Sequence, residues 1–259
     1  TSAAPRPSIS TYGIGCFSQE AYDFVDWLKD AGQTYWQILP LGVTSYGDSP
    51  YQSFSAFAGN PYFISLDELV KEGVLTAEEC KKAKFGRKAD DIDYSQLYKE
   101  RGRLLRLAYS RSDIGHNAEF AAFCEQNKWW LDDFALFMAV KGRFEGKPWI
   151  EWAEDIRLRW QNAMDYYRRE LYFEVEYYKY LQFKFDQQWR ALKAYANEKG
   201  IRIIGDIPIY VALDSADAWA NPQMFQLDED NIPTAVAGVP PDGFSPTGQL
   251  WGNPLYRWE

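Results

Sequence analysis

The chain has 259 residues, 37 of them acidic and 28 basic, and a formal net charge of −9. Because a protein that neutralises nucleic-acid phosphates carries clustered Lys and Arg, dispersed basic residues in an acidic chain argue against a nucleic-acid partner. Hydrophobic residues make up 46% and charged residues 25%, the usual balance of a folded globular protein. No apolar run approaches the roughly 20 residues of a membrane span, so we expect a soluble, cytoplasmic protein with no membrane partner.

Cysteine and histidine are too sparse for the common metal and disulfide patterns. Cys16, Cys80 and Cys124 are odd in number and widely spaced, which predicts neither a disulfide framework nor a zinc site. His116 is the only histidine, and its neighbours are typical of a surface loop. We therefore expect no metal centre.

Aromatic residues are the unusual feature of the composition, with 11 Trp, 18 Tyr and 16 Phe. Most of these rings are expected to fill the core. Tyr and Trp also offer a flat apolar face with a polar edge, which suits stacking on sugar rings. The composition therefore favours carbohydrate chemistry, although only weakly.

The first elements form a helix–strand unit. Apolar side chains at helical spacing predict a helix over residues 18–32, with Ser18 as its N-cap and Gly32 as its stop. Residues 35–41 follow as a buried strand that Pro40 ends. The next loop is rich in Tyr, Ser, Gly and Pro and lies at the carboxyl end of the strand, where α/β folds place binding loops.

A charged, helix-period region extends from about residue 67 to residue 199, and it predicts an all-helical insertion. Its expected helices cover residues 66–70, 76–84, 94–110, 117–127, 130–141 and 155–199. For aromatic runs such as Tyr166-Tyr167 and Tyr172-Phe173 to Tyr180, helix packing is the favoured interpretation over a sugar-binding platform.

Strand character returns at residues 201–211, after the helix-ending Gly200. A long irregular segment follows over residues 212–259. Its interleaved aromatic residues, including Phe244 and Trp251, predict an ordered functional segment, since disordered segments are poor in aromatics.

Two residues stand out as candidates before any resemblance is considered. Asp206 directly follows the late strand, where a carboxylate at the end of a barrel strand could hold substrate hydroxyls. A loop-capping role for Asp206 is equally consistent with the sequence. Tyr51 could stack on a sugar ring, but the residues alone favour a place in the core.

Long runs of the chain resemble the amylomaltases, or 4-alpha-glucanotransferases, of the alpha-amylase clan. They include Gly-Asp-Ser-Pro-Tyr-Gln-Ser from residue 47 and Gly-Asp-Ile-Pro-Ile-Tyr-Val from residue 205. The matching runs are residues 36–41, 47–61, 205–211, 214–220 and 239–258. The resemblance implies transfer of alpha-1,4-glucan segments between maltooligosaccharides, which serve as donor and acceptor, with no metal or organic cofactor.

The implied fold is α/β, a (β/α)8 TIM barrel with a large inserted all-helical subdomain. Residues 1–66 would hold the first barrel units and a substrate loop, residues 67–185 the helical insertion, and residues 186–259 the third barrel unit and a lid loop. This supplies about three of the eight strands. The resemblance therefore implies the N-terminal half of the enzyme, with the C-terminal half of the barrel as its missing partner.

The resemblance also implies site residues. Tyr51 would line the donor sugar's subsite, Asp206 would contact sugar hydroxyls, and residues 240–251 would form a flexible lid. The full implied substrate-binding set is Ser49, Tyr51, Asp206, Asp242, Phe244, Gln249, Trp251 and Asn253. Tyr46 and Tyr94 match positions that form a second glucan site in some relatives.

The catalytic carboxylates of the family have no counterpart in this sequence. A retaining mechanism needs a carboxylate nucleophile and a carboxylic acid/base. In this family the nucleophilic Asp lies in an Arg-x-Asp-His motif, which this chain lacks, so we expect both groups beyond Glu259. Asp214, Asp217 and Asp242 are not assigned the nucleophile's role. The alternative is a non-catalytic glucan-binding fragment.

Overall fold

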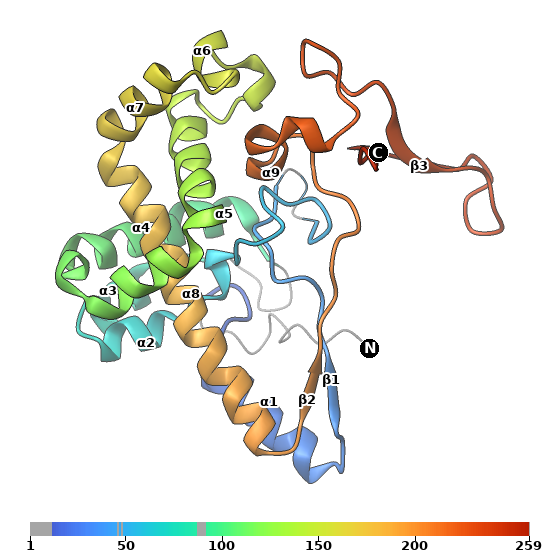
Figure 1. Ribbon diagram of the computed structural model, residues 1–259. Coiled ribbons are helices and arrows are strands. Elements are labelled where there is room, and N and C mark those ends of the chain that lie inside the picture. The colour runs from blue at the N-terminus through green and yellow to red at the C-terminus, as the bar shows by residue number, and fades with distance from the viewer. Residues whose placement is uncertain (1–11, 46, 48, 87–91, 259) are drawn as a thin grey trace. The chain divides into compact units, whose positions relative to one another are not determined.

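The computed structural model describes residues 12–45, 47, 49–86 and 92–258 (Figure 1). The chain divides into two compact units. Unit 1 consists of Thr1–Pro40, Gly59–Glu125 and Tyr180–Asp206, and unit 2 of Leu41–Ala58, Gln126–Lys179 and Ile207–Glu259. Each of the three segments expected from the resemblance contributes residues to both units. The units are therefore described separately.

Unit 1 combines a two-stranded parallel sheet with helices. Its elements are α1 (Gln19–Asp30), β1 (Tyr35–Gln37), η3 (Pro61–Phe63), α2 (Leu66–Lys71), α3 (Ala77–Lys82), α4 (Tyr94–Arg111), η4 (Ile114–His116) and β2 (Arg202–Ile204), with the start of α5 (Ala118–Arg143) and the end of α8 (Tyr172–Glu198). The helix α1 confirms the first expected helix, and Gly32, at φ +71°, lies just beyond it. Ser18 occupies the N-cap position, but its hydroxyl donates to the Glu20 carboxylate instead of accepting from the helix backbone.

Unit 2 contains most of the remaining helices and an antiparallel hairpin. Its elements are η5 (Trp149–Glu151), α6 (Glu154–Arg157), α7 (Gln161–Glu170), α9 (Ala216–Ala220), η6 (Pro222–Met224), β3 (Val236–Val239) and β4 (Gln249–Pro254), with the end of α5 and the start of α8.

The helical region differs from the sequence prediction in two places. The helices expected over residues 117–127 and 130–141 are one continuous helix, α5, because no Gly or Pro interrupts the sequence between them. The single helix expected over residues 155–199 is three helices. Its first break contains Arg159 at φ +58°, which is incompatible with a continuing right-handed helix.

The parallel sheet of unit 1 is shorter and more exposed than expected. Its register pairs Trp36 with Ile203, and the Ile38 amide also donates to the Ile204 carbonyl at 3.0 Å. Of the β1 residues only Trp36 is buried, against the Phe24 ring at 5.3 Å. The described parallel sheet has two strands, where about three were expected. The strand predicted over residues 201–211 ends at Ile204, before Gly205 and Pro208, which weaken sheet pairing.

Two glutamines of α8 hold the chain segment that contains η3 within unit 1. The Gln182 amide accepts from the Gly59 N–H at 2.7 Å and donates to the Gly59 carbonyl at 2.8 Å. The Gln188 amide accepts from the Ser65 N–H at 2.6 Å. These side chains imitate a strand pairing, so buried backbone groups are satisfied without a sheet. Gly59 also packs closely on Phe185, because a Cβ at this residue would lie 2.2 Å from the ring.

The core of unit 2 surrounds a buried ion pair. Trp149, Trp219 and Phe137 are fully buried in its hydrophobic cluster. The Lys141 ammonium donates to the Asp214 carboxylate at 2.6 Å, with side-chain exposures of 7% and 17%. Because an unpaired charge at this depth is costly, the pair fixes α5 to the segment that leads into α9.

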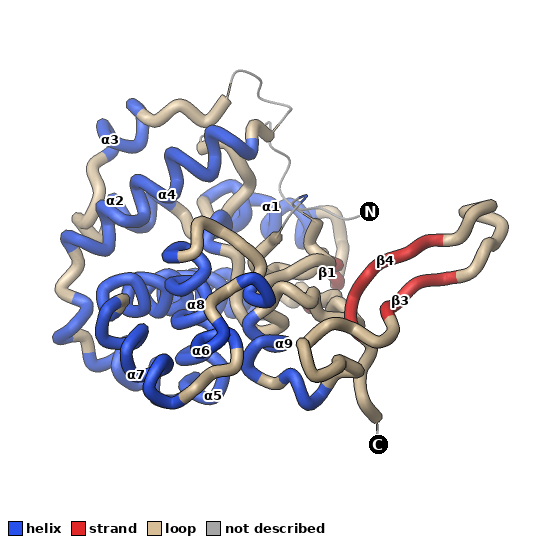
Figure 2. Tube along the Cα trace, turned by 90° about the horizontal axis from the view of Figure 1, so that it is seen from above, coloured by secondary structure: helices blue, strands red, loops and turns tan. Residues whose placement is uncertain are grey.

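The segment predicted as irregular over residues 212–259 contains regular structure. Its strands β3 and β4 pair antiparallel, with Val239 opposite Gln249, and they appear as the red ribbon pair in Figure 2. The connecting loop depends on Gly248 at φ +72°, where a Cβ would also approach the Val239 carbonyl to 2.6 Å. Gly and Pro in this region therefore shape a hairpin, whereas the sequence analysis expected a continuous loop.

None of the helices in the described ranges combines the length and the apolar character that crossing a membrane requires.

Gly59→Ala is expected to destabilise the protein by about 1–3 kcal/mol, because the new methyl group cannot fit beside Phe185. The matched control is Gly102→Ala in α4, where a Cβ meets nothing within 4 Å. Because Ala favours the helix over Gly, the free energy of unfolding of that variant is expected to rise by up to about 1 kcal/mol. Urea unfolding of both variants checks the prediction, and equal free energies of unfolding would contradict it.

Candidate functional site

A cavity of about 370 Å³ in unit 2 brings together four of the residues that the sequence analysis singled out. We call it the site cavity. It is lined by Ser49, Tyr51, Gln52, Pro208, Ile209, Tyr210, Trp251 and Asn253. Three chain segments meet here: the loop that follows residues 35–41, the segment after β2, and strand β4. The cavity therefore depends on the fold of unit 2 and not on one continuous motif.

The first wall is a tight turn of the early loop. Thr44 forms an antiparallel bridge with Ser53, and the Ser45 N–H donates to the Gln52 carbonyl at 3.0 Å. The Ser49 hydroxyl accepts from the Tyr51 N–H at 3.3 Å, which fixes the turn.

Tyr51 lies on the first wall of the site cavity and has 45% of its surface exposed. The preference for a core position, drawn from the residues alone, was therefore wrong. The turn that carries Tyr51 leaves much of its ring exposed to solvent.

The second wall is the segment after β2, and the sequence analysis missed its role. Tyr210 stacks on Tyr256, with ring centroids 5.9 Å apart and planes 13° apart, and its ring lies 6.3 Å from that of Trp251. Because the strand prediction extended through residue 211, Tyr210 was treated as a strand residue. Pro208 was the signal that could have revealed the strand's earlier end.

Strand β4 supplies the third wall. Trp251 is 41% exposed, and its indole N–H donates to the Gln249 side chain at 2.9 Å. The predicted residue Gln249 therefore orients the Trp251 ring without lining the cavity itself.

Asn253 connects all three walls. It is 4% exposed; its amide oxygen accepts from the Gln52 side chain at 3.2 Å, and its amide nitrogen donates to the Val211 carbonyl at 2.9 Å. A buried amide that donates and accepts in this way holds its partners in register. Gln52 was not predicted as a site residue, although it directly follows Tyr51 in a quoted motif.

Two further predicted residues belong to the hairpin loop between β3 and β4. Asp242 accepts from the backbone N–H groups of Phe244 and Ser245 at 2.9 and 2.8 Å, so its carboxylate shapes the turn. Phe244, in the same loop, is 98% exposed.

The remaining predicted residues lie in unit 1 or outside the described residues. Asp206 is the last residue of unit 1, beyond β2, with an exposed side chain. Tyr94 is the first residue of α4 and is half-buried. Tyr46 lies outside the described residues.

The other carboxylates considered in the sequence analysis have structural partners. Burial raises the pKa of Asp214 above its ordinary value, although the Lys141 ammonium acts in the opposite direction. Burial likewise raises the pKa of Asp217, whose carboxylate accepts from the Ala56 N–H at 2.8 Å. Neither residue lines the site cavity.

His116 is confirmed at the surface, in η4. Its ring Nδ1 lies 2.6 Å from the Asp113 carboxylate, which raises the pKa of His116. Across residues 12–45, 47, 49–86 and 92–258, no three His, Cys, Asp or Glu side chains come close enough to hold a metal ion.

The site cavity is suited to binding more than to bond cleavage. The exposed rings of Tyr51 and Trp251 offer flat apolar faces, and Ser49 and Gln52 offer hydrogen-bonding groups. This combination fits a polyol ring with one apolar face. The described residues that line the cavity include no Asp or Glu, so they hold no pair of carboxyl groups for glycoside chemistry.

Comparison with known proteins gives relatives of one kind. The chain is 52% identical over 248 residues to a 4-alpha-glucanotransferase of Clostridium butyricum, covering 95% of this chain and 51% of that protein. It is 50% identical to the 4-alpha-glucanotransferase of Thermus thermophilus, covering 96% of this chain and 49% of that protein. The chain thus spans about half the length of the curated relatives it matches.

A solved structure matches equally well. The structure of amylomaltase from Streptococcus agalactiae in complex with acarbose superposes with a TM-score of 0.92 at 44% sequence identity, covering 96% of this chain and 51% of that one. The family model described as 4-alpha-glucanotransferase matches residues 7–259. The chain therefore belongs to the 4-alpha-glucanotransferase family.

Proposed function

We propose that this chain is the N-terminal, sugar-binding part of a 4-alpha-glucanotransferase that transfers alpha-1,4-glucan segments between maltooligosaccharides. The observation that carries the proposal is the meeting of Tyr51, Trp251 and Asn253 at one cavity, from motifs about 200 residues apart in the matched family region. The whole protein would be a (β/α)8 barrel, to which β1 and β2 contribute, with residues 67–185 inserted as helices. No metal or organic cofactor is required.

The proposed mechanism is a retaining double displacement with its carboxylates outside residues 1–259. Retaining enzymes place the nucleophile and the acid/base about 5–5.5 Å apart across the glycosidic bond. Asp214 and Asp217 are held by Lys141 and by the Ala56 amide, which leaves them poorly suited to that role. The resemblance supports a nucleophilic Asp and an acid/base Glu from the remainder of the barrel.

Within the site cavity, we propose that Ser49, Tyr51 and Trp251 contact the donor glucan. For Asp206, contact with sugar hydroxyls is supported by the resemblance. The hairpin loop with Asp242 and Phe244 would close over the glucan. Tyr46 and Tyr94 would form a second glucan site. For Asn253 the hydrogen bonds to Gln52 and Val211 favour a positioning role over direct contact with sugar.

Incubation with maltotriose, followed by separation of the products, tests the activity. The protein of full family length is expected to give free glucose and a ladder of longer maltooligosaccharides. The 259-residue chain, its mass verified, is expected to give none while its Trp fluorescence still responds to the sugar. A ladder from this chain alone would contradict the assignment of the carboxylates to the rest of the barrel. Binding without turnover by the longer protein would favour the alternative, a non-catalytic glucan-binding protein.

Tyr51→Ala is expected to weaken binding of maltooligosaccharides about tenfold, which corresponds to about 1.4 kcal/mol. Tyr51→Phe keeps the ring and is expected to retain most of the affinity. The matched control is Tyr166→Ala on α7, which removes a similarly exposed ring outside the site cavity. Isothermal titration with maltoheptaose at matched protein concentrations measures the effect, and equal affinities for the two Ala variants would contradict it.

Asn253→Ala is expected to lower the free energy of unfolding by about 1–3 kcal/mol and to weaken sugar binding, because it leaves the Val211 carbonyl without its donor. Leu250→Ala, at an exposed position of the same strand that does not line the site cavity, serves as the control. If Asn253→Ala loses affinity at unchanged stability, Asn253 is a direct sugar ligand and the positioning role is wrong.

In the longer protein, Phe244→Ser is expected to increase hydrolysis relative to transfer, because the acceptor hydroxyl competes with water at the intermediate and a closed apolar lid excludes water. Tyr94→Ala is expected to change this ratio less. Product analysis with maltotriose gives both rates, and equal hydrolysis-to-transfer ratios in the two variants would argue against the lid assignment.

A further inference from the structure

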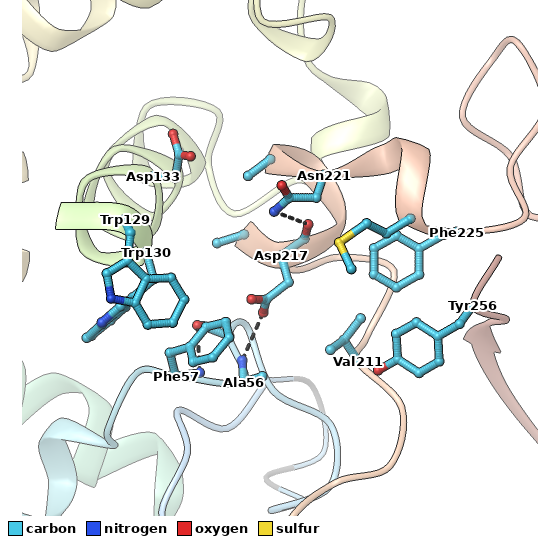
Figure 3. Close-up of a pocket in the computed structure, with 14 residues that line it drawn as sticks. Ala56, Phe57, Trp129, Trp130, Asp133, Val211, Asp217, Asn221, Phe225 and Tyr256 are labelled. Carbon is cyan, nitrogen blue, oxygen red and sulfur yellow. Dashed lines mark hydrogen bonds between the residues drawn. The ribbon is translucent and has the colours of Figure 1, made fainter. Parts of the chain in front are cut away.

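Unit 2 has a second cavity, of about 430 Å³, that contains none of the proposed sugar ligands (Figure 3). We call it the aromatic cavity. Its principal lining residues are Phe57, Trp129, Trp130, Asp217, Phe225 and Tyr256. The volume lies within the range of about 300–1,000 Å³ that small-molecule sites occupy.

Two groups of rings form opposite walls of the aromatic cavity. Phe57 packs edge-to-face on Trp129 with ring centroids 4.7 Å apart, and Trp130 lies beside them. Across the cavity in Figure 3, Phe225 packs on Tyr256 at 5.4 Å. Trp129 has 65% of its surface exposed, although large rings are normally buried. An exposed Trp at the mouth of a cavity is a surface for stacking a flat apolar ligand face.

Asp217 lies between the two walls, with its side chain pointing to the backbone of Ala56 in Figure 3. An ionised carboxylate has about four acceptor positions, and the Ala56 N–H takes one of them. Asn221 also lines the cavity, and its side chain lies 3.4 Å from the Asp217 carbonyl. The cavity thus offers hydroxyl-binding groups between two apolar walls.

The charge balance favours a neutral ligand. Asp133, which also lines the cavity, is paired with Arg159 at 2.7 Å, and the Arg159 guanidinium lies over the Trp219 ring. Burial disfavours the ionised form of Asp217 and raises its pKa. A cation would gain little from one weakened carboxylate, whereas a polyol needs only hydrogen-bond acceptors.

One ring pair separates the aromatic cavity from the site cavity. Tyr256 lines the aromatic cavity and stacks on Tyr210, which lines the site cavity. The two cavities are thus neighbours within unit 2, connected through the Tyr210–Tyr256 ring pair.

We propose that the aromatic cavity is an additional glucan-binding site, in which Trp129 stacks on a glucose ring and Asp217 accepts hydrogen bonds from its hydroxyls. The inference rests on the proposed function, because it identifies the ligand with the substrate class of the site cavity. The site would hold a distant part of a long glucan whose end occupies the site cavity.

Fluorine NMR of the full-length protein labelled with 5-fluorotryptophan tests the proposal, with acarbose as the probe. Trp→Phe variants assign the signals of Trp129, Trp251 and Trp160. Trp251 reports on the site cavity, and Trp160, which is 49% exposed and lines neither cavity, is the internal control. The expected result is that the Trp129 and Trp251 signals both shift while the Trp160 signal does not. Asp217→Asn should raise about fivefold the acarbose concentration at which half of the Trp129 shift is reached. The corresponding concentration for the Trp251 shift should stay unchanged.

Kinetics supply an independent readout. Trp129→Ala is expected to raise KM for amylose about fivefold and to leave kcat, and KM for maltotriose, unchanged, because a trisaccharide is expected to occupy the site cavity alone. Trp160→Ala is the matched control and is expected to change neither KM.

The remaining outcomes overturn the proposal in distinguishable ways. A shift of Trp251 without Trp129 would leave the proposed function intact and remove the additional site. If neither signal shifts, the proposed function and the additional site are both contradicted. A Trp129 shift with choline but not with acarbose would show a cation site, and an unchanged KM for amylose in Trp129→Ala would show that the cavity does not hold the substrate.

Discussion

The buried ion pair between Lys141 and Asp214 is the interaction on which unit 2 depends. The Lys141 ammonium also donates to the Lys147 carbonyl at 3.2 Å, and the Trp149 indole N–H donates to the Leu213 carbonyl at 2.7 Å. Leu213 and Asp214, which follow Val211 in the chain, are thus fixed to η5 and α5. Because the segment after β2 supplies the second wall of the site cavity, the position of Tyr210 depends on a charge pair outside the cavity. Replacing one partner would leave the other charge buried, which is the costly way to lose such a pair.

Binding groups and supporting groups are separated within unit 2. The rings of Tyr51 and Trp251 are exposed. Asn253 is buried, and its amide forms hydrogen bonds with protein groups. A carbohydrate site gains from this arrangement, because rigid rings bind an oligosaccharide with less loss of side-chain entropy. Asp214 and Asp242 are supporting groups as well, because each carboxylate accepts hydrogen bonds from the protein itself. Such groups hold a sugar-binding surface in place and leave the covalent chemistry to residues elsewhere.

The sequence predicted part of this site, and the limits have physical causes. The motif runs placed Ser49, Tyr51, Trp251 and Asn253 in one site, and the structure brings these four together. Helix periodicity found α1, α2, α3 and α4 within a few residues. Tyr51 was assigned to the core because a pattern of apolar residues does not show whether a turn points inward. Tyr166 and Phe173 are exposed, whereas Tyr167 packs against the core cluster and Tyr180 is buried, so helix packing accounts for part of those aromatic runs. Tyr210 and Gln52 were missed because a cavity between three segments exists only after the chain has folded.

The pairing of β1 with β2 also has a consequence for how the chain reaches this structure. Trp36 lies opposite Ile203, so the chain from η3 to α8 separates, in sequence, two strands of three residues each. The entropy of closing such a loop must be overcome before the pairing contributes, whereas α4 and α5 form from local contacts. The helices therefore fold ahead of the sheet. During synthesis, β1 cannot pair with β2 until the ribosome has delivered all of α8 and then β2 itself. Over that interval the edge of β1 is open to association with other chains.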